Sequence, residues 1–329
     1  MHAATITLLL FASAWARPKP AVSDSTGTLN FLVVGDWGGQ NTSPYYTAAE
    51  KDVAAAMGKT AQTLGSQFIV SVGDNFYDLG VTDVNDPRFK ATFEDIFTSP
   101  SLQTRWYQLF GNHDHEGNAS AQIAYTQLSK RWYMPDFYYT ETISIPGSTT
   151  TVQFIIIDTI ILCGDPTKKG SSFDSQSYNT AADEWAWINS TLQSTTADWI
   201  FVFGHYPVWS IGSNGPTKQL VDQLRPLFLQ YGVDGYFCGH DHSLQFIRDT
   251  NVSYIVSGAG HETSHSTAHM DDIPSNSLKF HYGPHDNSAE RGGYVSVSLT
   301  PSIMTVTYYD ESGSMLFSTE VPKNPKSSF

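Results

Sequence analysis

FLVVGDWGG at residues 31–39 is the first of five segments of one kind; the others are FIVSVGDNFY at 68–77, YQLFGNHDH at 107–115, WIFVFGHYP at 199–207 and GYFCGHDH at 235–242. Each contains an apolar run rich in β-branched or aromatic residues, which is typical of a buried strand. Each run ends at a glycine that is followed by Asp, Asn or His. Because strands aim the residues at their ends and loops expose them, we expect all five ends to meet at one rim.

Helical patterns alternate with these strands, at 47–65, 87–97, 120–131, 180–193 and 216–231. The first is rich in alanine and ends at Gly65, as the C-terminus of a helix commonly does. Two further strands are predicted at 150–159 and 252–258. This alternation favours an α/β fold with a largely parallel sheet covered by helices.

The end of the chain follows a different pattern. Residues 294–300, 302–309 and 315–321 alternate in period two, with a turn at 310–313. They predict an antiparallel meander, which we expect to pair with a second sheet. Two mixed β-sheets packed face to face and flanked by helices would use all of these pieces. The stretch 163–180 has no periodicity and is predicted to be a long exposed loop.

Residues 1–16, MHAATITLLLFASAWA, have an apolar centre and end in small residues. They predict a signal peptide that is cleaved before Arg17, which leaves 17–329 as a single domain without a membrane anchor. We therefore expect a secreted or lysosomal protein. In that setting N-glycosylation is expected at the four Asn-x-Ser/Thr sites, Asn41, Asn118, Asn189 and Asn251.

The net charge of −14 argues against a protein that binds nucleic acid, which would show basic patches. A phosphorylated substrate would need strong local positive charge, and metal ions are a ready source of it. With two cysteines the chain is no disulfide scaffold. Cys238 lies within a predicted strand, where a small buried side chain is expected.

The five segments supply carboxylate, phenol, amide and imidazole donors but no thiolate, a mixture that favours iron, manganese or zinc. The candidates are Asp36, Asp74, Tyr77, Asn112, His205, His240 and His242. Seven donors are too many for one ion that must also hold water and substrate, so a pair of ions sharing one carboxylate is expected. Two ions about 3.5–4 Å apart can clamp both oxygens of a phosphoryl displacement and generate hydroxide.

The ordered set GDWGG, GDNFY, GNHDH, GHYP and GHDH resembles that of the purple acid phosphatases, in particular their small, animal, tartrate-resistant type. The similarity covers essentially the whole chain after residue 16. It includes the stretches 120–139, 204–211, 220–227, 256–260 and 304–317. The resemblance implies a metallophosphoesterase domain with a four-layer αββα sandwich.

The resemblance also implies a division of the donors between two ions. Asp36, Tyr77 and His242 would hold a ferric ion together with Asp74. Asp74 would bridge to a divalent ion that is also held by Asn112, His205 and His240. The divalent ion would be Fe(II), with zinc or manganese as alternatives. His113 would contact the substrate phosphate or donate a proton, Asp114 would orient a neighbour, and His115 would lie at the rim of the site or on the surface.

The implied activity is that of a monomeric acid phosphatase. It would hydrolyse phosphate monoesters, small or carried by phosphoproteins, at acidic pH through a metal-bound hydroxide. One alternative is a phosphodiesterase or nucleotide hydrolase on the same scaffold. The other is an iron protein that performs redox chemistry or merely binds phosphate.

The sequence departs from the animal relatives at two places. Ser213 and Asn214 occur where the relatives have a Glu-His pair implicated in protonating the leaving group. Lys218 and Gln219 occur where the animal relatives have His-Cys. The cysteine that usually pairs with the one matching Cys163 is therefore absent. No disulfide between Cys163 and Cys238 is expected. His261, His265 and His269 lie in a loop rich in Gly, Ser and Thr and are predicted to be solvated.

Overall fold

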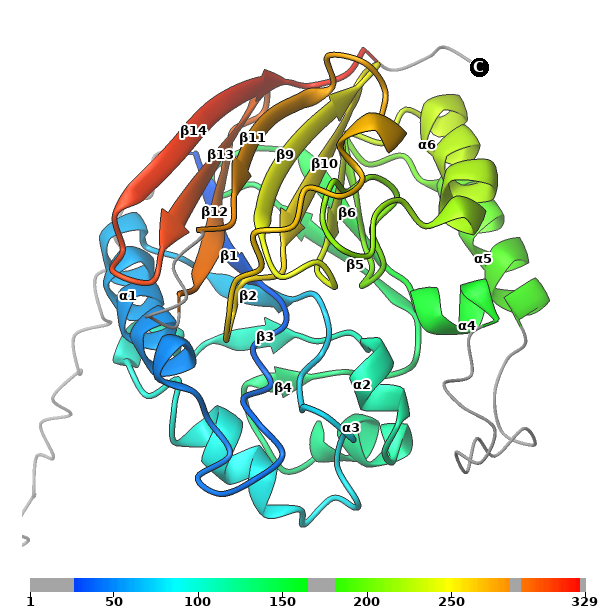
Figure 1. Ribbon diagram of the computed structural model, residues 1–329. Coiled ribbons are helices and arrows are strands. Elements are labelled where there is room, and N and C mark those ends of the chain that lie inside the picture. The colour runs from blue at the N-terminus through cyan, green and yellow to red at the C-terminus, as the bar shows by residue number, and fades with distance from the viewer. Residues whose placement is uncertain (1–26, 165–180, 285–290, 326–329) are drawn as a thin grey trace, which may run out of the picture.

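The structure is a computed structural model that describes residues 27–164, 181–284 and 291–325. The predicted signal peptide and nearly all of the loop predicted at 163–180 lie outside these ranges. Two seven-stranded sheets pack face to face, with helices on their outer faces (Figure 1). The predicted four-layer α/β architecture is therefore confirmed.

The first sheet contains the strands of the first three quoted segments. Its order is β14 (Met315–Pro322), β13 (Ile303–Asp310), β12 (Gly293–Leu299), β1 (Leu29–Val34), β2 (Phe68–Ser71), β3 (Arg105–Tyr107) and β4 (Trp132–Tyr133). Strands β1 to β4 are parallel, whereas β12 pairs antiparallel with β1. The predicted meander is thus present, but it extends the sheet of β1 and does not pair with the other sheet.

The second sheet contains the strands of the fourth and fifth quoted segments. Its order is β11 (Leu278–Tyr282), β9 (Leu244–Asp249), β10 (Val252–Ser257), β8 (Gly235–Cys238), β7 (Trp199–Phe203), β6 (Thr151–Ile156) and β5 (Tyr139–Ser144). Strands β6, β7, β8 and β10 are parallel. Their carboxyl ends, with those of β1 to β3, form the region that carries the predicted site.

Helix α1 (Ala48–Leu64) covers the outer face of the first sheet, within one residue of its predicted range at either end. Thr47 and Glu50 form a capping box at its start, and Gly65 ends it with a φ of 64°. The second sheet is covered by α4 (Thr159–Cys163), α5 (Ala181–Ser194) and α6 (Arg225–Tyr231) (Figure 1). Shorter helices are α2 (Asn112–His115), α3 (Ala119–Tyr125) and the turns Phe89–Glu94, Pro100–Leu102, Leu220–Leu224 and Met270–Asp272. None of the helices among the described residues has the length and apolar character needed to cross a membrane.

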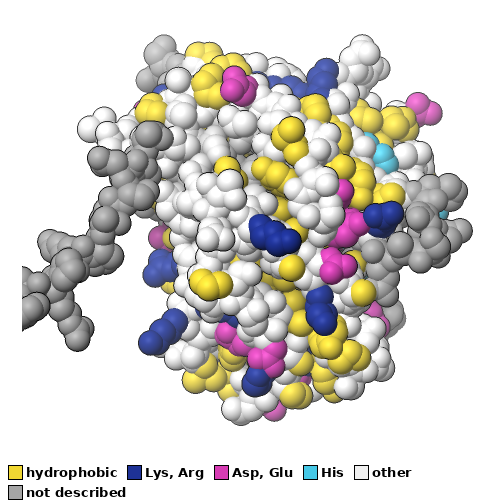
Figure 2. All heavy atoms as spheres, turned by 90° about the vertical axis from the view of Figure 1, so that its left-hand side faces the viewer, with side chains coloured by type: hydrophobic (Ala, Val, Ile, Leu, Met, Phe, Trp, Pro, Cys, Tyr) yellow, Lys and Arg dark blue, Asp and Glu magenta, His cyan; other side chains and the backbone are white. Residues whose placement is uncertain are grey.

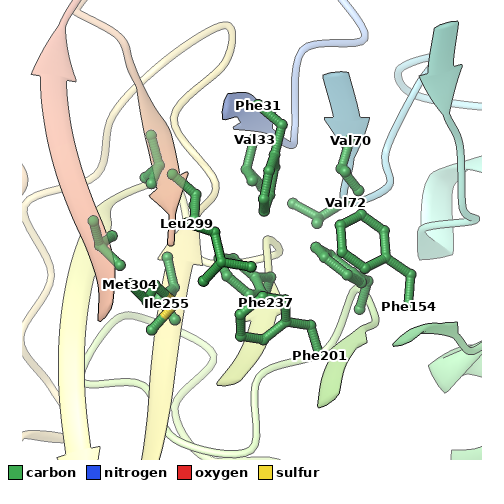
Figure 3. Close-up of a cluster of buried hydrophobic side chains, with 14 of the residues drawn as sticks. Phe31, Val33, Val70, Val72, Phe154, Phe201, Phe237, Ile255, Leu299 and Met304 are labelled. Atoms are coloured by element: carbon green, nitrogen blue, oxygen red, sulfur yellow. The ribbon is translucent and has the colours of Figure 1, made fainter. Parts of the chain in front are cut away.

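The central strands are buried on both faces, which explains their nearly continuous apolar runs. In β1, Phe31 and Val33 point between the two sheets, while Leu32 and Val34 pack on the helical side. Between the sheets, Phe31 approaches Phe237 of the second sheet (Figure 3). This packing fixes both sheets relative to each other, and with them the strand ends that carry the site.

The surface fits an acidic protein. On the face shown in Figure 2, lysine and arginine side chains lie singly among polar and acidic ones. No contiguous basic patch is visible on this face, and the full chain carries a net charge of −14.

Cys163 and Cys238 are not joined by a disulfide. Cys238 is 1 % exposed, as expected for a small core residue. Gln219 Nε2 donates to the carbonyl of Leu162 at 2.7 Å, so the side chain at position 219 reaches the residue next to Cys163.

We predict that peptide mapping under non-reducing conditions finds no linkage between Cys163 and Cys238. The variant Gln219→Cys should form a new disulfide with Cys163 and stabilise the fold by about 2–4 kcal/mol, measured by urea unfolding with and without reductant. A linked Cys163–Cys238 peptide from the unmodified protein would show this prediction to be wrong.

Candidate metal centre

All seven predicted ligands lie just beyond the carboxyl ends of parallel strands. Asp36 follows β1, Asp74 and Tyr77 follow β2, and Asn112 begins α2 after β3. His205 follows β7, and the pair His240 and His242 follows β8. The predicted rim therefore exists, but the two sheets contribute to it jointly.

Three of these residues have an unusual backbone conformation. The φ angles of Asp36, Asp74 and His240 are 55°, 52° and 70°, in the left-handed region that non-glycine residues seldom adopt. Such strained residues persist where the surroundings hold them in place, and they are concentrated at functional sites. Each follows a glycine at a strand end, so the chain turns abruptly and presents the side chain to the rim.

Two glycines that precede ligands, Gly111 before Asn112 and Gly239 before His240, are required by ligands from other strands. A Cβ atom at Gly111 would lie 2.1 Å from Asp74 Oδ1, and one at Gly239 would lie 2.2 Å from Asp36 Oδ2. Both distances are far shorter than a van der Waals contact. The glycine in each motif therefore makes room for the carboxylate of a different motif.

The first donor group surrounds Tyr77 Oη. This atom lies 3.0 Å from Asp36 Oδ1, 3.1 Å from Asp74 Oδ2 and 3.0 Å from His242 Nε2. The hydroxyl has one hydrogen, which can satisfy only one of these acceptors. Several lone pairs therefore face a common point, and a cation there would satisfy them all.

The second donor group shares Asp74 with the first. His205 Nε2 lies 3.2 Å from Asp74 Oδ2 and 3.1 Å from Asn112 Oδ1. Asp74, His205 and His240 offer ligand atoms that all lie within 4.8 Å of one another. Asp74 thus lies between the two groups of donors.

The charges of the site fit metal ions. The carboxylates of Asp36 and Asp74 belong to residues that are 0 % and 1 % exposed. Among the described residues their ion-pair partners are His205 and His242, with no lysine or arginine. Buried carboxylates without a fixed positive partner are costly, and the set of carboxylate, phenol, amide and imidazole donors suits iron, zinc or manganese.

Outer hydrogen bonds orient the donors. His205 Nδ1 donates to the carbonyl of Val72 at 2.9 Å, which leaves Nε2 for the site. The backbone N–H of His240 donates to Asp36 Oδ2 at 2.9 Å. The buried guanidinium of Arg88 donates to the carbonyl of Tyr77 and, at 2.7 Å, to that of Gly80. These bonds orient the ring of His205 and the carboxylate of Asp36 and hold the backbone that carries Tyr77 and His240.

From protein groups alone, the two histidines of the second group differ in charge. Burial lowers the pKa of His205, but Asp74 outweighs it and raises this pKa to about 9. Burial, followed by the charge of His205, lowers the pKa of His240 to about 3. An incoming ion would displace a proton from His205, whereas His240 is already in the neutral form that binds metals.

His113 and Asp114 lie at the start of α2. The backbone N–H of His113 donates to Asp74 Oδ1 at 3.0 Å, and its Nδ1 donates to the carbonyl of Asp78 at 2.6 Å. Asp114 is buried and accepts from the backbone N–H groups of Gly111 and Asn75, so it holds the two site loops together. Burial, together with the charge of Asp74, raises the pKa of Asp114 to about 6.

His115 lies neither at the rim nor on the surface, and both expectations for it are wrong. It is 3 % exposed, and its Nε2 lies 2.7 Å from Asp158 Oδ2. Asp158 is also the N-cap of α4. Because it lies far from His115 in the sequence, no local signal could have predicted this ion pair. The pair ties α2, which carries Asn112 and His113, to the helical layer of the second sheet.

Replacing Asp158 with Asn should lower the free energy of unfolding by about 3–5 kcal/mol, because a buried charge then lacks its partner while the cap is kept. Burial lowers the pKa of His115, but Asp158 raises it further, to a net value above the ordinary 6.5. The stabilisation of the fold by the His115–Asp158 pair is therefore complete below about pH 6.5. It is lost as the pH rises through the pKa of His115 in the folded protein.

Urea unfolding at acidic and alkaline pH measures this effect. The matched control is Asp272→Asn, which breaks an exposed pair with His269 and should cost only about 0–1 kcal/mol. An equal cost of Asp158→Asn at both pH values would mean that the His115 pair is not ionic.

His261 is not solvated as predicted, although His265 is exposed. It is 7 % exposed, its Nδ1 donates to the carbonyl of Asp36 at 2.5 Å, and its ring lies 4.4 Å from that of Tyr77. The neighbouring Glu262 accepts from His242 Nδ1 at 2.7 Å. A signal was present, because VSYIVSGAGH at 252–261 is another strand that ends at glycine before a histidine.

The departure at Ser213 and Asn214 lies beside the second donor group. Asn214 Nδ2 donates to the carbonyl of His240 at 3.1 Å, and its backbone N–H donates to Asp241 at 2.8 Å. Asp241 is 1 % exposed and also accepts from Ser210 and Ser213. This carboxylate, which the sequence did not single out, fixes the loop that borders the site.

The family model of the calcineurin-like phosphoesterases matches residues 29–244, the stretch that contains all seven donors, so the chain is of that class. Tartrate-resistant acid phosphatase type 5 of Oryctolagus cuniculus is 46 % identical, over 93 % of this chain and 95 % of that protein. Purple acid phosphatase 17 of Arabidopsis thaliana is 32 % identical, over 91 % of this chain and 85 % of that protein. Within the class, the chain belongs to the purple acid phosphatase family.

A solved structure of a different protein shares the fold. GAP50, the anchor in the inner membrane complex of Plasmodium, aligns with a TM-score of 0.77 and 24 % identity, over 91 % of this chain and 90 % of its own. At that identity the likeness concerns the fold alone. The function of the present chain must therefore be argued from its site.

Proposed function

We propose that this protein is an acid phosphatase that hydrolyses phosphate monoesters with a ferric ion and a divalent ion. The observation that carries this proposal is the position of Asp74, whose carboxylate faces Tyr77 Oη at 3.1 Å and His205 Nε2 at 3.2 Å. Asp36, Tyr77 and His242 would complete the ferric site. Asn112, His205 and His240 would complete the divalent site, with Fe(II), zinc or manganese.

When bound, the two ions would polarise the phosphoryl oxygens and make a water molecule acidic enough to react at low pH. The exposure of the donors indicates where substrate enters. Asp36, Asp74 and His205 are buried, whereas His240 and His242 are partly exposed. The substrate phosphate would therefore approach from the side of these two histidines.

His113 is proposed to contact the phosphate. Its ring lies 4.6 Å from that of Tyr77 and is partly exposed. Because the carbonyl of Asp78 can only accept, Nδ1 carries a hydrogen, and Nε2 is left for the substrate. The imidazole could thus bind a phosphoryl oxygen or deliver a proton at Nε2.

The remaining proposals concern the setting of the enzyme. Removal of residues 1–16 would yield a secreted or lysosomal monomer, which acts on small monoesters or phosphoproteins. The four asparagines Asn41, Asn118, Asn189 and Asn251 are all exposed, as N-glycosylation requires.

The test is a substrate panel on purified protein of known metal content. We expect turnover of aryl phosphate monoesters at acidic pH, and much slower turnover of bis-esters and nucleotides. Preferred cleavage of bis-esters or nucleotides would favour the alternative hydrolases. Failure of the protein with both ions bound to cleave any monoester would overturn the proposal.

Asn214→His should restore a proton donor beside His240. General acids commonly contribute about 10²–10⁴-fold, so we expect kcat for alkyl phosphates, which have poor leaving groups, to rise by at least about tenfold. Aryl phosphates with good leaving groups should change little. The control Asn214→Gln keeps an amide and should leave kcat unchanged for both alkyl and aryl phosphates. An equal change in kcat for both classes of substrate in Asn214→His would contradict the prediction.

A further inference from the structure

His242 is hydrogen-bonded on both sides of its ring. Its Nε2 lies 3.0 Å from Tyr77 Oη, inside the first donor group. Its Nδ1 lies 2.7 Å from Glu262 Oε1, on the side away from that group. Glu262 is exposed, with 57 % of its side chain accessible.

His242, His261 and Glu262 form a second cluster of possible metal ligands, but two of its members, His242 and Glu262, are joined by a hydrogen bond. Their ligand atoms do lie within 4.8 Å of one another. Two ligands on one tetrahedral ion, with bonds of about 2.0–2.1 Å, are about 3.3 Å apart. The 2.7 Å between His242 Nδ1 and Glu262 Oε1 is too short for that and is the length of a charge-assisted hydrogen bond.

This hydrogen bond determines which nitrogen of His242 can bind a metal. A carboxylate only accepts, so Nδ1 carries a hydrogen, and Nε2 is the nitrogen left to bind a metal beside Tyr77 and Asp36. A carboxylate on the outer nitrogen also makes the imidazole a stronger donor, and loss of such partners commonly weakens metal affinity about 10–100-fold.

The segment that carries Glu262 is tied down at three places. Thr47 Oγ1, at the start of α1, donates to the carbonyl of His261 at 2.9 Å. His261 Nδ1 donates to the carbonyl of Asp36, and the backbone N–H of Ser264 donates to the carbonyl of His242. The carboxylate therefore approaches His242 from a fixed backbone in spite of its exposure.

We propose that Glu262 is a positioning residue that fixes His242 as a ligand of the ion beside Tyr77 and stabilises the trivalent state of that ion. The inference rests on the proposed function. It extends that function by adding a negative charge from the 261–264 loop to the three anionic donors Asp36, Asp74 and Tyr77.

The test compares Glu262→Ala, Glu262→Gln and the unmodified full-length protein. Ala removes the hydrogen bond and the charge, whereas Gln keeps an acceptor of the same shape. We expect iron release to a chelator to be about 10–100-fold faster in Glu262→Ala, and less affected in Glu262→Gln. In both variants the reduction potential of the ferric ion should rise and the tyrosinate absorption band should move to longer wavelength.

The matched control is Asp272→Asn. It removes an equally exposed carboxylate that accepts from His269 Nδ1 at 2.6 Å, but His269 is not among the donors. Wild-type iron release, potential and absorption in both Glu262 variants would overturn the inference while leaving the proposed function intact. An unmodified protein that holds no iron and shows no tyrosinate band would overturn both.

Discussion

Asp74→Asn is expected to lower kcat for phosphate monoesters by at least about 10³-fold. Asp74 is the one carboxylate shared by both donor groups, and it also accepts from the backbone N–H of His113. Asp74 Oδ2 is the oxygen that faces both donor groups, and an amide in its place carries no negative charge, so it would hold both ions only weakly. Electrostatic stabilisation by metal ions is worth several kcal/mol in such reactions, which corresponds to this loss.

The control for Asp74→Asn is Asp78→Asn. It removes one negative charge at an exposed position four residues along the same loop, where Asp78 accepts from Asn41. We expect this variant to retain wild-type kcat and metal content. Rates and metal content should be measured on the same preparations; an Asp74→Asn protein that keeps both ions and full activity would refute the shared role of this carboxylate.

Tyr77→Phe is expected to abolish the visible absorption band and to weaken retention of the ferric ion. Tyr77 Oη is the only atom removed, and it lies within 3.1 Å of three other donors. The ring would keep its packing between His113 and His261, at 4.6 Å and 4.4 Å. Loss of the band would therefore report on the phenolate oxygen and not on a collapsed site.

Tyr206→Phe is the control for that experiment. Tyr206 lies beside the second donor group, with its ring 4.5 Å from that of His240. Loss of the Tyr206 hydroxyl should leave the visible absorption band in place. Survival of the band in Tyr77→Phe, or the lack of any band in iron-loaded unmodified protein, would contradict the ferric assignment.

The strands and the donors could be predicted because their signals are local. An apolar run such as FLVV at 31–34 followed by Gly-Asp shows both the strand and the side chain at its end. The pairing of strands could not be read in this way. Strand β12 joins β1 from more than 250 positions away in the chain, and only the packing of the whole core decides that it extends the first sheet.

The contacts of the residues around the donors were harder to predict from the sequence. His115 is buried because Asp158 lies opposite it, and Glu262 matters because His242 faces it; both partners are remote in the sequence. His261 shows a different failure. Its loop composition indicated solvent exposure, but the preceding strand places it against Tyr77, so tertiary position overrode local composition.

The donors are divided between the sheets: Asp36, Asp74, Tyr77 and Asn112 follow strands of the first, and His205, His240 and His242 follow strands of the second. Ions held by both sets would cross-link two layers that otherwise meet through apolar packing. Binding of this kind adds to the free energy of unfolding in proportion to the logarithm of the free metal concentration. A molecule that lost its ions would lose activity and rigidity together, so inactive molecules would also be the first to be cleaved by proteases.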